Sequence, residues 1–176
     1  MIMKLIKNSI SDNLYSLCCN ELNTFKHKHR WTSSRVTWGE TLEEGITGSC
    51  ISTPVSEEVQ DLLEEELKST LPECDILRFQ HYIWQVGSGI CWHNDWSPTR
   101  VFGATIYLNE TTNTNSGGWF IWEDKQGGHH VYLPEKKALI INDEYECHCV
   151  TPVALEFRCT IQIWGEKSRP HGTHKH

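Results

Sequence analysis

The sequence predicts a mainly β domain with N-terminal helices, an α+β arrangement in which the strands form a sandwich or a barrel. The hydrophobic period is close to 3.6 residues before Pro72 and close to 2 after it, which indicates helices followed by strands. The apolar runs after Pro72 are short and nearly evenly spaced, as in β-sandwiches and β-barrels. The length of 176 residues suits one domain with its own core.

Two amphipathic helices are expected before Pro72. Ser11 is a candidate N-cap for the first helix and Ser56 for the second, where Glu57 and Glu58 suit the positive end of the helix dipole. We expect Pro72 to stop the second helix. The apolar faces of the two helices are Leu14, Leu17, Cys18 and Leu22, and Val59, Leu62, Leu63 and Leu67. Both faces are expected to pack on one outer face of the sheets.

The chain divides into a helical support region, a β core and a tail. Residues 1–75 form the support region, which also allows a strand around Val36–Trp38. Residues 76–166 form the core, and residues 167–176 are expected to be a disordered tail. The core strands are expected at residues 76–86, 89–93, 101–109, 118–123, 129–133, 137–142, 146–151 and 157–165.

Composition excludes several classes of function. The 16 basic and 23 acidic residues give a net charge of −7, which argues against a protein that binds nucleic acid by neutralising phosphates. No run approaches the ~18–20 apolar residues that span a bilayer, and the first residues lack the apolar core of a signal peptide. We therefore expect an intracellular, cytoplasmic protein that contacts no membrane. Its eight cysteines are expected to be buried, reduced thiols.

One pair of residues in the β core has the spacing of a metal site. His93 and Asp95 follow the turn Gly87–Gly89, at a point where a strand leaves its sheet and both side chains can chelate one ion. His148, late in the β series, is the best candidate for a third ligand. The alternative interpretations are a pair on a surface loop and a buried histidine bonded to the backbone.

Arg158 is another candidate functional residue, because it faces the polar side of an apolar strand. An arginine inside a barrel is costly without an anion, and an acidic co-substrate would satisfy it through a bidentate contact. An ordinary surface arginine is the alternative. Cys147 and Cys149 flank His148 but point to the opposite face of a strand, which disfavours a Cys-His-Cys zinc site.

Five pieces of the sequence occur in a characteristic order. They are Gly87 to Asp95, Thr105 to Asn109, Gly117 to Phe120, His148 to Val153, and Arg158 to Trp164. Together they resemble the iron(II)/2-oxoglutarate-dependent oxygenases, and within these the prolyl 4-hydroxylase-like branch. The resemblance covers residues 76–166 and implies a double-stranded β-helix, a jelly-roll or cupin-like barrel, with helices packed on one face.

The resemblance implies a dioxygenase in which His93, Asp95 and His148 bind Fe(II). Its co-substrates would be 2-oxoglutarate and dioxygen, with ascorbate as the reductant, and 2-oxoglutarate would be decarboxylated to succinate and carbon dioxide. The substrate it implies is a prolyl residue in a peptide or protein. A dioxygenase that dealkylates nucleic acid and a non-catalytic β-barrel binding module are the competing hypotheses.

The resemblance also implies which residues bind the co-substrate. Arg158 would pair with the distal carboxylate of 2-oxoglutarate, and the hydroxyl of Tyr107 would support that carboxylate. Thr160 or Gln162, on the strand of Arg158, would add a hydrogen bond. One further contact in this pocket stays open, since three residues compete for it, namely Tyr82, Ile83 and Trp84.

Three residues are candidates for contact with the substrate. Trp96 and Arg100 follow Asp95 on a loop that borders the substrate groove in the prolyl hydroxylase-like pattern. Trp164 lies on the side of its strand that carries Arg158. Tryptophan and arginine are enriched at binding interfaces, which is the physical reason for selecting these three.

Overall fold

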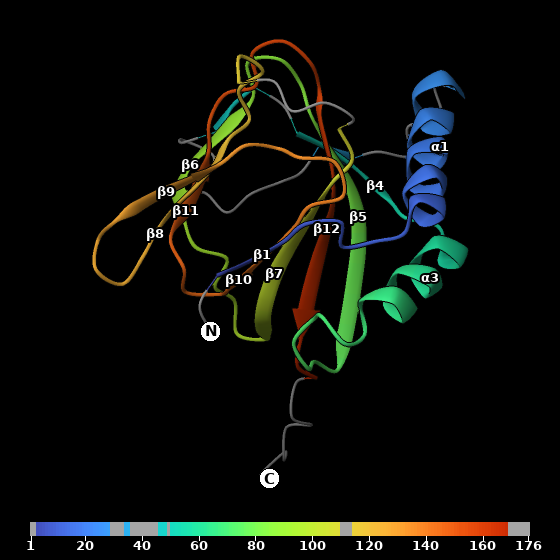
Figure 1. Ribbon diagram of the computed structural model, residues 1–176, viewed down its shortest axis with the longest axis horizontal. Coiled ribbons are helices and arrows are strands. Elements are labelled where there is room, and N and C mark those ends of the chain that lie inside the picture. The colour runs from blue at the N-terminus through green and yellow to red at the C-terminus, as the bar shows by residue number, and fades with distance from the viewer. Residues whose placement is uncertain (1–2, 29–33, 36–45, 49, 110–113, 169–176) are drawn as a thin grey trace, which may run out of the picture.

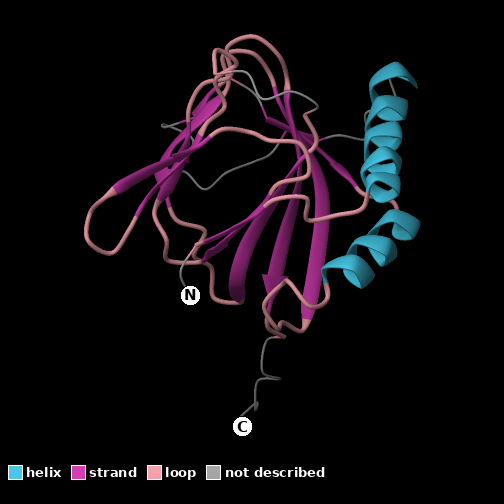
Figure 2. Cartoon of the chain, in the orientation of Figure 1, coloured by secondary structure: helices cyan, strands magenta, loops and turns pink. Residues whose placement is uncertain are grey.

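Two antiparallel β-sheets lie on either side of a central cavity, and two helices cover the outer side of the larger sheet (Figures 1 and 2). This computed structural model describes residues 3–28, 34–35, 46–48, 50–109 and 114–168. The architecture is mainly β with two N-terminal helices, as the change of hydrophobic period predicts.

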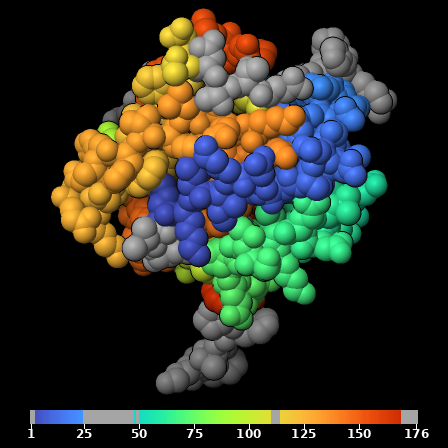
Figure 3. Space-filling model, in the orientation of Figure 1, coloured from blue at the N-terminus to red at the C-terminus, as the bar shows by residue number. Residues whose placement is uncertain are grey.

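The larger sheet has seven strands and the smaller sheet has five. Across the larger sheet the order is β1 (Lys4–Ile6), β10 (Leu139–Asp143), β7 (Arg100–Tyr107), β12 (Arg158–Glu166), β5 (Ile76–Trp84), β4 (Cys50–Pro54) and β2 (Ser34–Arg35). Across the smaller sheet the order is β3 (Ile46–Thr47), β6 (Gly89–His93), β11 (His148–Val150), β8 (Phe120–Glu123) and β9 (His129–Tyr132). Figure 3 shows β1, in blue, lying along the orange segment that contains β10.

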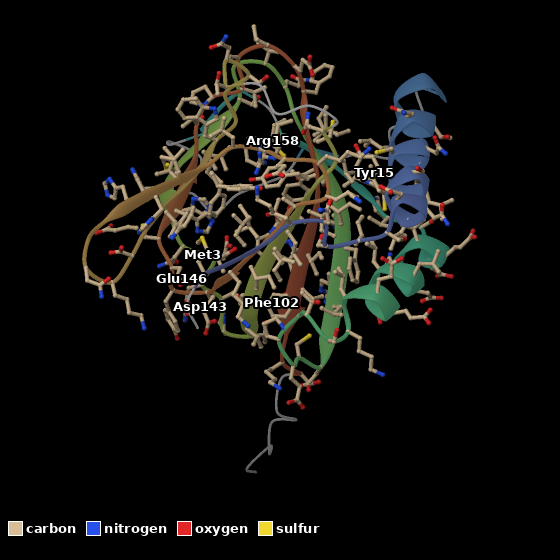
Figure 4. The ribbon with its side chains drawn as sticks, in the orientation of Figure 1. Met3, Tyr15, Phe102, Asp143, Glu146 and Arg158 are labelled. Atoms are coloured by element: carbon tan, nitrogen blue, oxygen red, sulfur yellow. The ribbon has the colours of Figure 1, made fainter. Side chains whose placement is uncertain are left out.

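The two helices are α1 (Asp12–Lys28) and α3 (Glu57–Leu67). Ser56 caps α3, because its hydroxyl accepts a hydrogen bond from the backbone N–H of Val59 at 3.4 Å. On α1, Tyr15 points toward the sheet (Figure 4), and its hydroxyl donates to the carbonyl oxygen of Leu108 at 3.0 Å. The contact of Tyr15 joins α1 to the chain that follows β7, and α3 packs through Leu63 and Leu67 in the same apolar cluster as residues of the larger sheet.

Alternation along the strands of the larger sheet separates two apolar clusters. Residues on one side pack beneath the helices, and residues on the other side face the smaller sheet. The first cluster includes Phe79, Ile83, Ala104, Ile106, Ile161 and Ile163, together with Leu14, Cys18, Leu63 and Leu67 of the helices. The second includes Tyr82, Trp84 and Tyr107, together with Ile90, Phe120 and Val150 of the smaller sheet. The cavity between the sheets is therefore walled by both.

Three details of the N-terminal half differ from the prediction. Leu17 is 42% exposed and does not belong to the buried face of α1. Helix α3 ends at Leu67, so that Pro72 lies beyond its end rather than stopping it. The support region also contributes the edge strands β1, β2 and β3, and strand β4, which lies between β5 and β2. The strand expected around Val36–Trp38 lies outside the described residues.

The core strands agree with the predicted runs to within two residues at most ends. β8 begins at Phe120, two residues later than predicted, because Gly117 and Gly118 have φ angles of +65° and +66° and break the extended conformation. At the end of the chain, Lys167 and Ser168 donate backbone hydrogen bonds to Thr99 and Asp75, both at 2.8 Å. The other residues of the predicted tail, 169–176, lie outside the described residues.

All eight cysteines are free thiols, as predicted, but Cys91 is exposed and only Cys18, Cys50 and Cys159 are fully buried. The expectation that every thiol is buried is therefore wrong. No helix in the described part of the chain is both long enough and apolar enough to cross a bilayer.

Candidate active site

Three side chains that the sequence singles out lie together at the end of β6. The pairing of β6 with β11 places His93 opposite His148, and their ring centroids are 4.4 Å apart. Asp95 lies beside both rings: Oδ1 is 3.7 Å from Nε2 of His93, and Oδ2 is 3.6 Å from Nε2 of His148. One donor atom from each residue lies within 4.8 Å of the others, a spacing that suits one metal ion. No other such group occurs among the residues that the structure describes.

A β-bulge brings His93 to the cavity. The pairing of β6 with β11 shifts between Ile90 and His93. Cys91 and Trp92 are both exposed at this point, whereas Ile90 and His93 both line the cavity. Residues three apart cannot share a side of a regular strand, so the bulge is what allows this arrangement.

Both imidazoles are oriented by neighbouring backbone carbonyl groups. Nδ1 of His93 lies 2.8 Å from the oxygen of Cys91, and Nδ1 of His148 lies 2.9 Å from that of Glu146. When Nδ1–H donates to the carbonyl, the lone pair on Nε2 is directed into the shared site. Burial lowers the pKa of His93, and the nearby His148 lowers it further. The neutral ring is the form that binds a metal.

Glu146, whose carbonyl orients His148, is itself held in place (Figure 4). Its carboxylate accepts hydrogen bonds from the backbone N–H groups of Met3 and Asp143 at 2.8 and 2.9 Å. The turn before β11 is thereby tied to the segment that leads into β1.

Asp95 is held by a strand far from it in the sequence. Asn142, which is 2% exposed, donates from Nδ2 to Oδ2 of Asp95 at 2.8 Å. Gly103 lies opposite Asn142, and a Cβ at Gly103 would be 2.7 Å from Oδ2 of Asp95. A glycine at this position therefore leaves room for the carboxylate. Sequence reasoning missed both residues, because neither belongs to a motif.

Arg158 lies in the space between the two sheets, at the start of β12 (Figure 4). It is 5% exposed and donates from one terminal nitrogen to the hydroxyl of Tyr107 at 3.3 Å. Its guanidinium carbon lies 5.1 Å from the ring centroid of Tyr107 and 5.5 Å from that of Trp84. Arg158 and the hydroxyl of Tyr107, both expected to contact the distal carboxylate of 2-oxoglutarate, thus lie within hydrogen-bond distance of each other.

Two buried polar atoms on the inward face of β12 have no hydrogen-bond partner among the described residues. They are Nε of Arg158 and Oγ1 of Thr160, on alternate positions of β12 and therefore on one face. Buried donors normally have partners. A carboxylate placed here would accept from both, so the residues present fit an acidic co-substrate such as 2-oxoglutarate.

The cavity has a volume of about 40 Å³ and connects the two groups of residues. Tyr82 and Trp84 both line it, whereas Ile83 packs beneath the helices, so that two of the three residues considered for this contact face the cavity. Gln162 also lines it and accepts a hydrogen bond from the hydroxyl of Thr105 at 2.9 Å.

The three candidate substrate residues occupy different environments. Trp164 lines the cavity. The guanidinium of Arg100 stacks 3.7 Å from the ring centroid of Trp164 and lies 3.7 Å from a carboxylate oxygen of Glu166. Trp96 is 56% exposed, and its side chain is not part of the cavity wall. Arg100 and Trp164 therefore contact each other, whereas Trp96 lies outside the cavity wall.

Comparison with solved structures shows a shared fold at low sequence identity. A prolyl 4-hydroxylase from Pseudomonas putida is 15% identical, with a TM-score of 0.75 over 95% of this chain and 93% of that one. A prolyl hydroxylase from Trichoplax adhaerens is 14% identical, with a TM-score of 0.80 over 93% and 83%. The epimerase SnoN from nogalamycin biosynthesis is 11% identical, with a TM-score of 0.67 over 98% and 82%. No curated protein sequence matches this chain.

The two sheets thus form the double-stranded β-helix of these oxygenases. Its cavity combines a His-x-Asp…His cluster with a buried arginine, the donor set that Fe(II) and a dicarboxylic 2-oxo acid require. Residues 77–166, just over half of the chain, match the 2OG-Fe(II) oxygenase superfamily. The chain therefore belongs to this superfamily and is a dioxygenase that uses Fe(II) and 2-oxoglutarate.

Proposed function

We propose that this dioxygenase hydroxylates a prolyl residue in a peptide or protein. The similarity of its fold to two prolyl hydroxylases, over more than nine-tenths of this chain, is the observation that carries the proposal. The Trichoplax enzyme was solved with a peptide fragment of hypoxia inducible factor. The net charge of −7 also favours a peptide over a nucleic acid, whose phosphates attract basic proteins.

In this proposal, His93, Asp95 and His148 would hold Fe(II), and the metal would supply the site at which 2-oxoglutarate and dioxygen react. The support is the convergence of the two Nε2 atoms and the carboxylate of Asp95 on one point. Asn142 donates a hydrogen bond to Oδ2 of Asp95 and would so orient this carboxylate toward the metal.

The proposed contacts of 2-oxoglutarate lie on β12 and β7. Arg158 pairs with the distal carboxylate, and the hydroxyls of Tyr107 and Thr160 complete its hydrogen bonds. Gln162 contributes a polar wall between this carboxylate site and Asp95, because it lines the same cavity. When bound, iron supplies the activation of dioxygen that is coupled to decarboxylation of 2-oxoglutarate to succinate and carbon dioxide.

The chain's own residues orient the reactants and exclude water. Phe120 stacks on His148 with ring centroids 5.0 Å apart and interplanar angle 20°, and so covers one side of the metal site with a hydrocarbon ring. Trp164 forms another part of the cavity wall. We propose that Trp164 and Arg100, with Trp96 on the adjoining loop, contact the peptide. Arginine and tryptophan are the side chains that most often anchor such interfaces.

Turnover of 2-oxoglutarate to succinate, with and without added Fe(II), tests the site. His93→Ala and His148→Ala should abolish turnover, and Arg158→Ala should mainly raise the KM for 2-oxoglutarate. Full turnover in either histidine variant would remove that residue from the metal site. An unchanged KM in Arg158→Ala would remove Arg158 from its role.

Mass spectrometry of candidate prolyl peptides tests the substrate. The expected product is heavier by one oxygen atom, only when 2-oxoglutarate is present. Oxidation of methylated single-stranded DNA, with no modified peptide, would instead favour the dealkylating hypothesis.

The eight free thiols further lead us to propose a reducing, intracellular compartment.

A further inference from the structure

Asn109 lies directly opposite Arg158, where two strands of the larger sheet part. β7 ends at Tyr107, which is paired with Thr160 of β12. Continued in the same antiparallel register, this pairing places Asn109 opposite Arg158. β12 begins at Arg158, beyond the residue that pairs with the end of β7, and the backbone N–H of Leu108 donates to the carbonyl oxygen of Cys159 at 2.9 Å.

The side chain of Asn109 makes two further hydrogen bonds along this edge of β12. Its Nδ2 donates to the carbonyl oxygen of Phe157 at 2.8 Å, and its Oδ1 accepts from the backbone N–H of Cys159 at 2.9 Å. These two backbone groups flank Arg158. A single amide thus supplies the donor and the acceptor that a paired residue of a β-ladder would supply.

On its other side β12 is paired with β5 as far as Arg158, which lies opposite Trp84, and before Arg158 the chain leaves the sheet. The residues before Arg158 are exposed, with Leu155 at 57% and Phe157 at 49% exposure. The guanidinium of Arg158 makes one protein hydrogen bond, the 3.3 Å contact with Tyr107, and its Nε makes none to the described residues. A small cavity of about 20 Å³, lined by Asn109, Phe157 and Arg158 among others, leaves space for this strand end to shift.

We propose that Asn109 is a positioning residue for the co-substrate: it holds the backbone on both sides of Arg158, so that the guanidinium meets the distal carboxylate of 2-oxoglutarate. The inference rests on the proposed role of Arg158. Asn109 acts through Arg158 rather than on the reacting atoms, since both of its hydrogen bonds are to backbone groups.

Binding measured without turnover tests this role. Wild type and Asn109→Ala are loaded with Mn²⁺ as a redox-inert metal, and thermal unfolding is followed during titration with 2-oxoglutarate or 2-oxobutanoate. The second acid has the same 2-oxo carboxylate but no distal carboxylate. We expect Asn109→Ala to weaken 2-oxoglutarate about tenfold, the effect of losing one or two hydrogen bonds. Binding of Mn²⁺ and of 2-oxobutanoate should not change, because neither depends on Arg158.

Two further variants control the experiment. Asn109→Asp keeps an acceptor for the N–H of Cys159 but loses the donor to Phe157, and should give a smaller loss than Asn109→Ala. Gln60→Ala removes a side-chain amide that also binds a backbone carbonyl, from Nε2 to Val55 at 2.7 Å, but at the start of α3. It should leave the affinities for both acids unchanged.

The possible outcomes separate the two proposals. An equal loss of affinity for both acids would show a general structural defect and overturn the role of Asn109. Unchanged affinity for 2-oxoglutarate in Asn109→Ala would overturn it as well. A wild-type protein that does not respond to 2-oxoglutarate at all would overturn the proposed function, and this inference with it.

Discussion

Single residues of the active site depend on contacts between distant strands. Asp95 belongs to a recognisable motif, but the orientation of its carboxylate comes from Asn142, 47 positions later in the chain. The two imidazoles depend instead on carbonyl groups two residues away, at Cys91 and Glu146. The sequence therefore indicates the candidate metal ligands, whereas the orientation of the Asp95 carboxylate depends on Asn142 in the larger sheet.

Asn142→Ala should weaken the metal site. The variant removes the hydrogen-bond donor to Oδ2 of Asp95, and loss of such an outer contact typically costs about 10–100-fold in metal affinity. Titration with Mn²⁺ by calorimetry measures it. Asn94→Ala is the matched control, because Asn94 adjoins Asp95 but its amide oxygen accepts from the backbone N–H of Trp96. Equal affinities in all three proteins would show that Asn142 has no part in metal binding.

Gly118→Ala should disturb the co-substrate site. Gly118 has a φ of +66°, and a Cβ there would be 3.0 Å from Cδ of Arg158. We expect about 1–2 kcal/mol lower stability from the left-handed backbone, and in addition a several-fold weaker affinity for 2-oxoglutarate. Gly127→Ala is the matched control, because Gly127 has a similar φ of +80° and a Cβ there would be 3.7 Å from Oε1 of Glu123. Thermal titration with 2-oxoglutarate should distinguish the two variants; a similar affinity in both would separate Gly118 from the site.

At the scale of elements, the amphipathic pattern locates both helices, but burial depends on how each helix sits on the sheet. Leu63 is fully buried, whereas Leu17, also assigned to an apolar face, is 42% exposed. Helical periodicity defines a stripe, and the edge of that stripe is decided by the neighbouring element.

Leu63→Ala should lower the free energy of unfolding by about 2–5 kcal/mol, because it removes buried methyl groups and leaves a cavity beneath α3. Leu17→Ala should change it by less than about 0.5 kcal/mol, as for most surface substitutions. Urea denaturation measures both. Comparable losses in the two variants would mean that α1 and α3 pack differently from the structure described here.

Glu21 joins α1, α3 and β5. Its carboxylate accepts from the backbone N–H and hydroxyl of Ser56 at 2.7 and 3.0 Å, and lies 3.6 Å from Nε2 of His81. Burial acts to raise the pKa of Glu21, but the hydrogen bonds from His81 and Ser56 outweigh it, and the pKa lies below its ordinary value.

A lowered carboxyl pKa stabilises the fold above the unfolded pKa, and this stability is lost as the pH falls through the folded pKa. Glu21→Gln should therefore cost about 1 kcal/mol at neutral pH, and the difference from wild type should shrink in acid. Urea denaturation across a pH series measures this. Glu64→Gln, at an exposed position of α3, should follow the wild-type profile. A pH-independent difference for Glu21→Gln would show that its charge is not involved.

At the scale of the whole molecule, the active site joins the two sheets. Two of the proposed metal ligands, His93 and His148, come from the smaller sheet, whereas Arg158 and Tyr107 come from the larger one. A co-substrate that contacts both ends of the cavity should therefore hold the sheets together.

Binding of metal and 2-oxoglutarate should raise the Tm. A ligand present at 100 times its Kd stabilises the folded state by about 2.7 kcal/mol. We expect stabilisation by Mn²⁺ alone and a further increase with 2-oxoglutarate. Arg158→Ala should retain only the first effect, and His93→Ala should lose both. Stabilisation of His93→Ala by Mn²⁺ to the wild-type level would place the metal elsewhere.

Local sequence patterns are enough to predict the fold class, the helix starts, the positions of most strands and the candidate site residues His93, Asp95, His148 and Arg158. These features depend on local periodicity, capping residues and the spacing of side chains along one strand or loop, all of which are written in neighbouring positions. The order of the motifs then indicated the family.

The side chains that surround the candidate ligands are known only from the tertiary structure. The bulge in β6, the contact of Asn142 with Asp95, the inward orientation of Tyr82 and Trp84, and the position of Asn109 opposite Arg158 all depend on strand register. A shift of one residue in register would reverse the side to which every side chain of a strand points. Between strands far apart in the sequence, the register also depends on how those strands pack together, which the residues of one strand alone do not specify.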